Sequence, residues 1–249
     1  MSESPSIRIR DLTTPAEFEQ AVEVQKHVWG FEELELLPVR LFVVASHIGG
    51  QTFGAYHGDR MVGFLLAVPG MKPGGRFYLH SHMLGVLREY RNLGVGRMLK
   101  LRQREDALQR GIPLVEWTFD PLEIKNAYFN IERLGVVVRR YVLNQYGFTT
   151  SHLHGGLPTD RCTAEWWVAS ARVEAIMSGR PCPRPAVAAR IELPARIQAL
   201  RREHPKQARE IQHAVSEQFL EHLGRGLAVI GFERDERVGA YLLGEWQSD

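Results

Sequence analysis

The sequence predicts an α/β protein built on a mixed sheet, and three observations lead to this class. Several short stretches alternate apolar and polar residues with the period of two expected of half-buried strands. Other stretches place apolar residues at helical spacing and are long enough to be crossover helices. The early strands follow one another as hairpins, whereas helices separate the later ones. This order is typical of a mixed sheet with helices on both faces.

The N-terminal elements can be justified in order. Residues 7–12 alternate as a first strand, and Thr13-Thr14-Pro15 followed by Glu17 provides the start of a helix, which Gly30 ends. A second helix is expected over 38–47. Two apolar runs joined by His57-Gly-Asp59 then predict a hairpin. The later elements expected are a strand at 78–86, a helix at 95–110, a strand at 114–119, a helix at 122–134 and strands at 136–143 and 163–168.

The chain changes character near Pro181, where several prolines predict a stiff connector. A strand at 187–193, helical stretches at 195–223 and a hairpin at 227–246 follow. We therefore divide the chain into a first domain (1–170), a Pro-rich connector (171–186) and a β-α-β-β extension (187–249). The extension repeats the element order of the N-terminal half. It is either a degenerate half-repeat or an unrelated sheet extension or dimerisation arm, through which a homodimer could form.

The composition limits the class of protein. The chain has 249 residues with 44% hydrophobic and 24% charged residues, typical of a globular protein. Its 31 basic and 29 acidic residues give a net charge of +2, which does not favour a nucleic-acid partner. Two cysteines without metal-like spacing fit a reducing compartment. Neither a signal peptide nor a membrane-length apolar stretch is present, so we expect a cytoplasmic protein that binds no membrane.

The most informative stretch is the junction of the strand at 78–86 with the helix at 95–110. Helix N-termini attract phosphate through exposed N–H groups and a positive dipole end, and glycines allow a close approach to the backbone. Gly94 and Gly96 lie at this junction, with Arg91 before them and Arg97 and Lys100 after them. No third glycine completes a dinucleotide fingerprint, and no Gly-Lys-Ser/Thr forms a Walker loop. A structural turn is the alternative to a phosphate site.

Arg91-Asn-Leu-Gly94-Val-Gly96 resembles the acyl-CoA-binding signature of the GNAT superfamily of N-acyltransferases, Arg/Gln-x-x-Gly-x-Gly/Ala. Leu84-Gly-Val86 resembles the end of the family's fourth strand, and the element order matches the family's fold from Ile7 to about Val168. The resemblance implies a GNAT-like fold that uses acetyl-CoA or another acyl-CoA as co-substrate. It implies that CoA contacts Leu84, Val86, Arg91, Asn92, Leu93, Gly94, Val95, Gly96, Arg97 and Asn126.

The same resemblance implies direct attack of an amine on the thioester, without a nucleophilic Ser or Cys. Family members often protonate the leaving thiolate with a Tyr four residues before a Gly, and here that position is Ile131. Tyr128, one turn earlier, is a possible substitute or a packing residue. Glu116, a charge in an apolar strand, is the candidate general base, unless it faces solvent. His80 and His82 share a strand face opposite Leu79 and Met83, and either could relay protons.

The loop before the strand at 163–168 occupies the place where family members line the acceptor site. Asp160 could recognise an ammonium group and Arg161 a carboxylate, or the two could form a surface salt bridge. His152/His154 and His80/His82 are two His-x-His pairs, but nothing in the sequence brings them together, and we expect no metal site. Trp166 and Trp167 must point to opposite faces, so at least one belongs to the core.

We therefore predict an acyl-CoA-dependent N-acyltransferase that acetylates a small or amino-acid-like amine. The alternative is a non-catalytic acyl-CoA sensor or scaffold of the same fold, motivated by Ile131 and the extension. Transfer of an aminoacyl group from tRNA is a third reading, which the balanced charge does not encourage.

Overall fold

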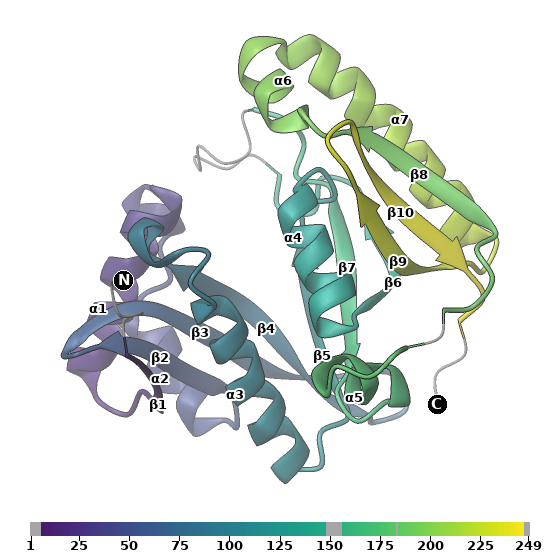
Figure 1. Ribbon diagram of the computed structural model, residues 1–249. Coiled ribbons are helices and arrows are strands. Elements are labelled where there is room, and N and C mark those ends of the chain that lie inside the picture. The colour runs from purple at the N-terminus through teal and green to yellow at the C-terminus, as the bar shows by residue number, and fades with distance from the viewer. Residues whose placement is uncertain (1–5, 148–155, 183, 247–249) are drawn as a thin grey trace. The chain divides into compact units, whose positions relative to one another are not determined.

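The computed structural model describes residues 6–147, 156–182 and 184–246 of the chain (Figure 1). They form two compact units, which meet along the chain between Val115 and Glu116. The predicted mixed α/β class is confirmed, since strands and helices alternate through both units. The predicted domain limits at residues 170 and 187 fall inside the C-terminal unit.

The N-terminal unit carries four antiparallel strands in the order β1-β2-β3-β4. Its elements are β1 (Ile7–Asp11), α1 (Pro15–Trp29), α2 (Val39–His47), β2 (Gln51–His57), β3 (Arg60–Met71), β4 (Phe77–Val86) and α3 (Val95–Gln109), with 3-10 turns at Glu33–Glu35 and Arg88–Tyr90. The predicted elements of this part of the chain are all present, with shifts of one to three residues at their ends.

Local chemistry explains where α1 begins and ends. The Thr14 hydroxyl accepts a hydrogen bond from the Glu17 N–H, and the Glu17 carboxylate accepts one from the Thr14 N–H, which together form a capping box. Gly30 ends the helix with a left-handed φ of 63°. The helix thus starts and stops where the sequence predicts.

Helices cover both faces of the N-terminal sheet. Phe18 of α1 and Phe42 of α2 pack on one face, in a cluster that includes Phe64 and Leu66 of β3. Val95 and Leu99 of α3 pack on the other face, in a cluster that includes Leu65 of β3. The alternation of Leu65 and Leu66 between the two clusters follows from the pleat of the strand.

A β-bulge in β4 corrects one expectation about this strand. Leu66 pairs with Met83 and Ala67 with Ser81, so His82 is an extra residue without a partner on β3. The bulge reverses the alternation that follows it, and Met83 packs with the α1/α2 cluster, on the side of His80. The expectation that Met83 lies opposite both histidines is therefore wrong, because it assumed an unbroken period of two.

The C-terminal unit has the strand order β5-β7-β6-β9-β10-β8. Its elements are β5 (Leu114–Phe119, entered from the N-terminal unit), α4 (Ile124–Tyr128), a π-helix (Phe129–Arg133), β6 (Val137–Val142), β7 (Arg161–Trp167), α5 (Ala171–Met177), β8 (Ala189–Pro194), α6 (Ile197–Glu203), α7 (Pro205–Gly224), β9 (Ala228–Arg234) and β10 (Val238–Gly244). The helix α5, with Ser170 as its N-cap, lies where we expected only a connector.

The extension continues the sheet of the C-terminal unit. β10 pairs antiparallel with both β9 and β8. In the N-terminal unit the first strand pairs instead with the first strand of its hairpin, since β1 pairs with β2. The two strand orders differ, so pairing does not support a half-repeat and favours a sheet extension.

Helices α4 and α7 cover the same face of this sheet. Tyr241 of β10 contacts the Phe219 ring of α7 with centroids 5.0 Å apart, and its hydroxyl donates to the Pro121 carbonyl at 2.6 Å. A side chain at Gly239, two residues before Tyr241 on the same face, would meet Ile124 of α4 at 3.1 Å. The core of the unit therefore lies between these helices and one face of the strands.

Candidate functional site

The predicted phosphate loop joins β4 to α3 in the N-terminal unit. Arg91, Asn92, Leu93 and Gly94 are exposed, and the chain passes through two left-handed residues, Asn92 with φ 64° and Gly94 with φ 82°. The Arg91 side chain contacts the end of β4, where its Nε donates a hydrogen bond to the Val86 carbonyl at 3.1 Å. The loop thus has a defined backbone shape.

The N-terminus of α3 has the features that suit a phosphate group. Gly94 is the N-cap and has no side chain, so no side-chain cap satisfies the first-turn N–H groups. A Cβ at Gly96 would meet only Leu84, at 3.7 Å. Arg97 follows on the first turn and is half-buried. Residues 91–97 therefore fit the pyrophosphate of CoA, with the chemistry supplied by backbone donors and positive charge.

The predicted site residues of β4 lie on both faces of the strand. His80 and His82 are neighbours, with ring centroids 5.9 Å apart, on the side of α1 and α2. Leu84 and Val86 pack toward α3. His82 is exposed at the surface of the strand, yet desolvation by the surrounding protein lowers the pKa of its imidazole. The ring is therefore neutral over a wider pH range than a free histidine.

A buried polar network lies beneath β4, and sequence analysis missed it. Lys100 is 3% exposed; its Nζ donates to Ser81 Oγ at 3.0 Å and to Gln103 Oε1 at 2.9 Å. Gln103 in turn donates to Gln51 Oε1 at 2.7 Å, and Gln51 to Asp106 at 2.6 Å. Burial lowers the pKa of Lys100 well below its usual value. The network joins α3 to β2 and to β4 beside the bulge.

The predicted general base, Glu116, is on β5 in the C-terminal unit. Its side chain is 4% exposed, and both carboxylate oxygens accept hydrogen bonds from Arg140 Nη2, at 3.0 and 2.9 Å. The alternative of a solvent-facing edge position does not hold for Glu116. The arginine was not predicted, although a charge in an apolar strand signals that a partner is required.

Two of the remaining predicted residues are on α4. The Tyr128 ring is half-buried under Arg234 of β9, with Cζ 4.1 Å from the ring centroid. Asn126 is exposed, and its Oδ1 accepts a weak hydrogen bond from Asn130 at 3.4 Å. Ile131, at the usual position of the acid, is fully buried within the π-helix. A π-helix turns the following side chains out of α-helical register, so spacing alone could not place this position.

Asp160 directly precedes β7 and Arg161 is its first residue, and both are buried. The Asp160 carboxylate accepts hydrogen bonds from the Asn144 N–H at 2.8 Å and from the Ser216 hydroxyl at 2.8 Å. Arg161 Nη1 lies 3.9 Å from Asp120, and its guanidinium stacks over Tyr146 at 5.3 Å. The Asp160 carboxylate is thus bound by donors of its own unit, and its recognition of an acceptor ammonium group stays a prediction. The alternative of a surface salt bridge between the two residues does not hold, because both are buried and Arg161 lies beside Asp120.

No group of three or more His, Cys, Asp or Glu in the described part of the chain could hold a metal ion. His152 and His154 lie outside the described residues.

Cys162 is fully buried, and burial raises the pKa of its thiol well above the usual range. A thiol in this environment stays protonated and is a poor nucleophile.

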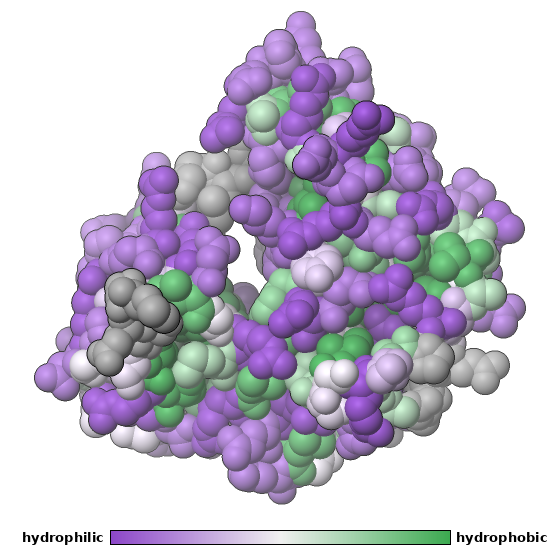
Figure 2. Space-filling model, viewed as in Figure 1, coloured by the Kyte–Doolittle hydropathy of each residue, from purple (hydrophilic) through white to green (hydrophobic). Residues whose placement is uncertain are grey.

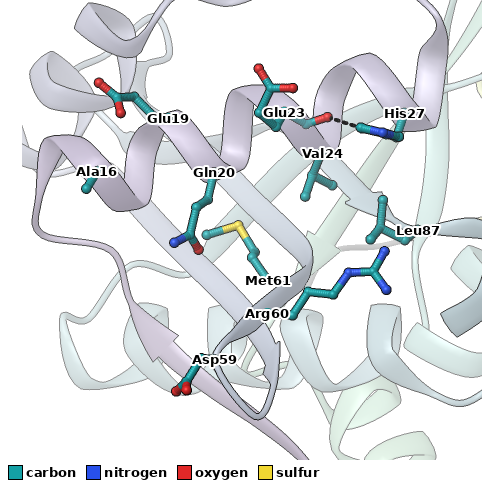
Figure 3. Close-up of a pocket in the computed structure, with 10 residues that line it drawn as sticks. All are labelled: Ala16, Glu19, Gln20, Glu23, Val24, His27, Asp59, Arg60, Met61 and Leu87. Atoms are coloured by element: carbon teal, nitrogen blue, oxygen red, sulfur yellow. Dashed lines mark hydrogen bonds between the residues drawn. The ribbon is translucent and has the colours of Figure 1, made fainter.

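A pocket of about 540 Å³ in the N-terminal unit lies between α1 and the turn from β2 to β3 (Figure 3). Figure 3 shows Gln20 of α1 and Arg60 beside Met61 and Leu87, with the carboxylates of Glu19, Glu23 and Asp59 farther out. None of the predicted site residues lines it. Its rim is mostly acidic, which does not suit the phosphates of CoA.

The face seen in Figure 2 is mainly hydrophilic, with only small hydrophobic areas. Within residues 6–147, 156–182 and 184–246, no helix has both the length and the apolar character needed to cross a membrane.

The model of the Acetyltransferase (GNAT) family matches residues 11–135, half of the chain. The chain therefore belongs to the GNAT family of acetyltransferases, as the sequence motif predicted. No curated protein matches it.

Solved structures of the same fold cover about two-thirds of the chain. Naa50 of Arabidopsis thaliana, in complex with the bisubstrate analogue CoA-Ac-MVNAL, has a TM-score of 0.52 at 17% identity, over 64% of this chain and 97% of its own. The ribosomal-protein-S18-alanine N-acetyltransferase of Escherichia coli has a TM-score of 0.52 at 15% identity, over 67% and 96%. A Salmonella typhimurium protein with its cofactor acetyl-CoA has a TM-score of 0.53 at 14% identity, over 68% and 98%. At these identities the likeness concerns the fold alone.

Proposed function

We propose that this protein transfers an acetyl group from acetyl-CoA to the amine of a small, amino-acid-like acceptor. The observation that carries the proposal is the loop of residues 91–96, which presents an uncapped helix N-terminus after two left-handed residues. Anions bind at such N-termini through backbone N–H groups. Two of the GNAT structures described above hold CoA-containing ligands, which supports acetyl-CoA as the co-substrate.

In the proposed reaction the acceptor nitrogen attacks the thioester carbonyl directly. The ammonium group first loses one proton to yield the nucleophilic amine, and the carbon–sulfur bond breaks as the carbon–nitrogen bond forms. The nitrogen then loses its second proton, and the thiolate gains one to leave as a thiol. The candidates to take the first proton are Glu116 of the C-terminal unit and, separately, His80 and His82 of the N-terminal unit, and Tyr128 is the candidate that protonates the thiolate.

Thiol release from acetyl-CoA across a panel of amines tests the function. We expect amine-dependent release in the wild type and a loss of at least ~100-fold in kcat for Glu116→Gln, as for other general bases. Glu174→Gln, on the surface of the C-terminal unit, is the matched control. A protein that binds acetyl-CoA but releases no thiol with any amine would instead be the sensor or scaffold alternative.

A further inference from the structure

One face of the C-terminal sheet carries two ion pairs of the same design. Glu116 pairs with Arg140 at 2.9 Å, and Glu165 pairs with Arg139 at 2.6 Å. Both carboxylate side chains are 4% exposed, whereas the arginine side chains are 52% and 41% exposed. Each pair thus places a buried negative group beneath a half-exposed positive one.

A bulge in β6 brings the two arginines to the same face. Val138 pairs with Ala164 and Arg140 pairs with Thr163, so Arg139 is the extra residue of the strand. Side chains of directly paired residues share a face, which places Arg140 with Thr163 and with Glu165, two residues along β7. Arg139 reaches Glu165 on this face, and Arg140 reaches across β7 to Glu116 on β5. Consecutive residues of a regular strand could not do this.

This charged face is opposite the core of the unit. Trp117 and Trp166 contact each other on the other face, with ring centroids 5.9 Å apart. Tyr141 stacks there on Phe219 of α7 at 4.7 Å. Because α7 and α4 pack on that side, the ion pairs are not part of the apolar packing between strands and helices.

Each guanidinium keeps donors outside its ion pair. Arg140 reaches both oxygens of Glu116 through Nη2 alone, and Arg139 reaches Glu165 through Nε and Nη2. Within the described part of the chain, no hydrogen bond engages Nη1 of either arginine. Arginine is the side chain best suited to bind a carboxylate through two donors.

We propose that Arg139 and Arg140 bind a carboxylate of the acceptor while Glu116 receives its ammonium group. The acceptor is then an amino acid or another amine with a carboxylate nearby, and this inference rests on the proposed acetyl transfer. The charges favour such a zwitterion, since the two carboxylates and two guanidiniums of the site are neutral overall. A plain cationic amine would meet the two arginines, and a plain acid would meet the two glutamates.

Structural stability alone does not account for the arrangement. Buried ion pairs are often no more stabilising than apolar residues of similar volume, because the desolvation of the charges offsets their attraction. Two such pairs on adjacent strands, each with a half-exposed guanidinium, are therefore better explained by recognition of a charged ligand.

The test compares each proteinogenic amino acid with its own C-terminal amide as acceptor, by thiol release from acetyl-CoA. We expect the wild type to favour the acids by at least ~10-fold in kcat/KM, the scale of a charge-assisted contact. Arg140→Gln and Arg139→Gln should raise KM for the acid at least ~10-fold more than KM for the amide, because only the acid offers a carboxylate to the arginines, whereas any effect of Arg140→Gln through Glu116 falls on both acceptors. Arg140→Lys keeps the positive charge but lacks the planar guanidinium with its two parallel donors. Its KM for the acid should therefore lie between those of the wild type and Arg140→Gln.

Arg190→Gln is the matched control, because Arg190 is also a half-exposed strand arginine paired with a glutamate, Glu233 at 2.9 Å. Circular dichroism and thermal unfolding show whether each variant is folded. Equal use of acids and amides, or arginine variants that affect both alike, would overturn the zwitterion site while acetyl transfer stands. Thiol release from no amine at all would overturn the proposed function, and the zwitterion site with it.

Discussion

The Asp160 carboxylate accepts a hydrogen bond from the Ser216 hydroxyl at 2.8 Å, which joins the start of β7 to the middle of α7. The same hydroxyl lies 2.8 Å from the Tyr141 hydroxyl of β6. All three side chains are buried. Residues 187–246 are thus bound into the core of the C-terminal unit by a polar network as well as by apolar packing.

Ser216→Ala should therefore destabilise the protein by about 1–3 kcal/mol, since it leaves buried polar groups of Asp160 and Tyr141 with one partner fewer. Urea denaturation measures this. Ser46→Ala is the control, because the Ser46 hydroxyl is exposed and bonds only within its own helix, to the Val43 carbonyl. If both variants lose the same stability, the network does not tie the extension to the core.

Gly96→Ala should stabilise the fold and weaken the binding of acetyl-CoA. Alanine in a helix is more stable than glycine by up to about 1 kcal/mol, and the new methyl group would meet only Leu84 at 3.7 Å. The same methyl group would obstruct a phosphate that approaches the backbone. Thermal unfolding and calorimetric titration measure the two effects; an unchanged affinity would contradict the assignment of Gly96.

Lys100 should make the free energy of unfolding depend on pH below about 10.5. Burial lowers the pKa of Lys100 in the folded protein well below the usual 10.5. Between the folded-state pKa and 10.5, the unfolded chain therefore binds more protons than the folded protein does. Stability therefore rises with pH through this window, up to about 10.5. Lys100→Met should lack the rise.

The difference between wild type and variant isolates Lys100 from other groups. Burial raises the pKa of Tyr241 well above its usual value, and this acts in the opposite direction at alkaline pH in both proteins. Lys206→Met, an exposed lysine on α7, is the control. A parallel pH dependence in wild type and Lys100→Met would show that Lys100 is charged when folded.

Tyr128→Phe separates the proposed acid from its packing role. Phenylalanine keeps the ring under Arg234 and removes only the hydroxyl. We expect kcat to fall at least ~10-fold with little change in KM, at the lower end of acid catalysis. Arg234→Gln removes the stacking and keeps the hydroxyl, and should change kcat much less. A wild-type kcat in Tyr128→Phe would make the residue a packing residue.

Local sequence signals predicted most of the elements. The capping box of Thr14 and Glu17, the turn at 57–59 and the glycines of the phosphate loop act through neighbouring residues, so their effects can be inferred from a short stretch. The prediction that at least one of Trp166 and Trp167 belongs to the core is confirmed by Trp166, which is fully buried and whose Nε1 donates to the Leu134 carbonyl at 2.7 Å.

Other features depend on register between distant residues. The bulges at His82 and Arg139 are visible only in the pairing of their strands, and each changes which side chains share a face. The pairing of Glu116 with Arg140 spans β5, β7 and β6, whose order in the sheet differs from their order along the chain. The charge of Glu116 in an apolar strand indicated that a basic partner was needed, but no rule of sequence spacing identified that partner as Arg140.

The central claim is that the loop of residues 91–96 binds acetyl-CoA, and calorimetric titration of Gly94→Ala tests it most directly. Gly94 has a φ of 82°, which costs an alanine about 1–2 kcal/mol, although no atom would obstruct its Cβ. Gly74, with a φ of 83° in another exposed turn, is the matched control. We predict micromolar binding in wild type and Gly74→Ala and at least ~10-fold weaker binding in Gly94→Ala, as expected when an anion site loses its backbone shape. Equal affinity in all three proteins, or no binding by the wild type, would contradict the account.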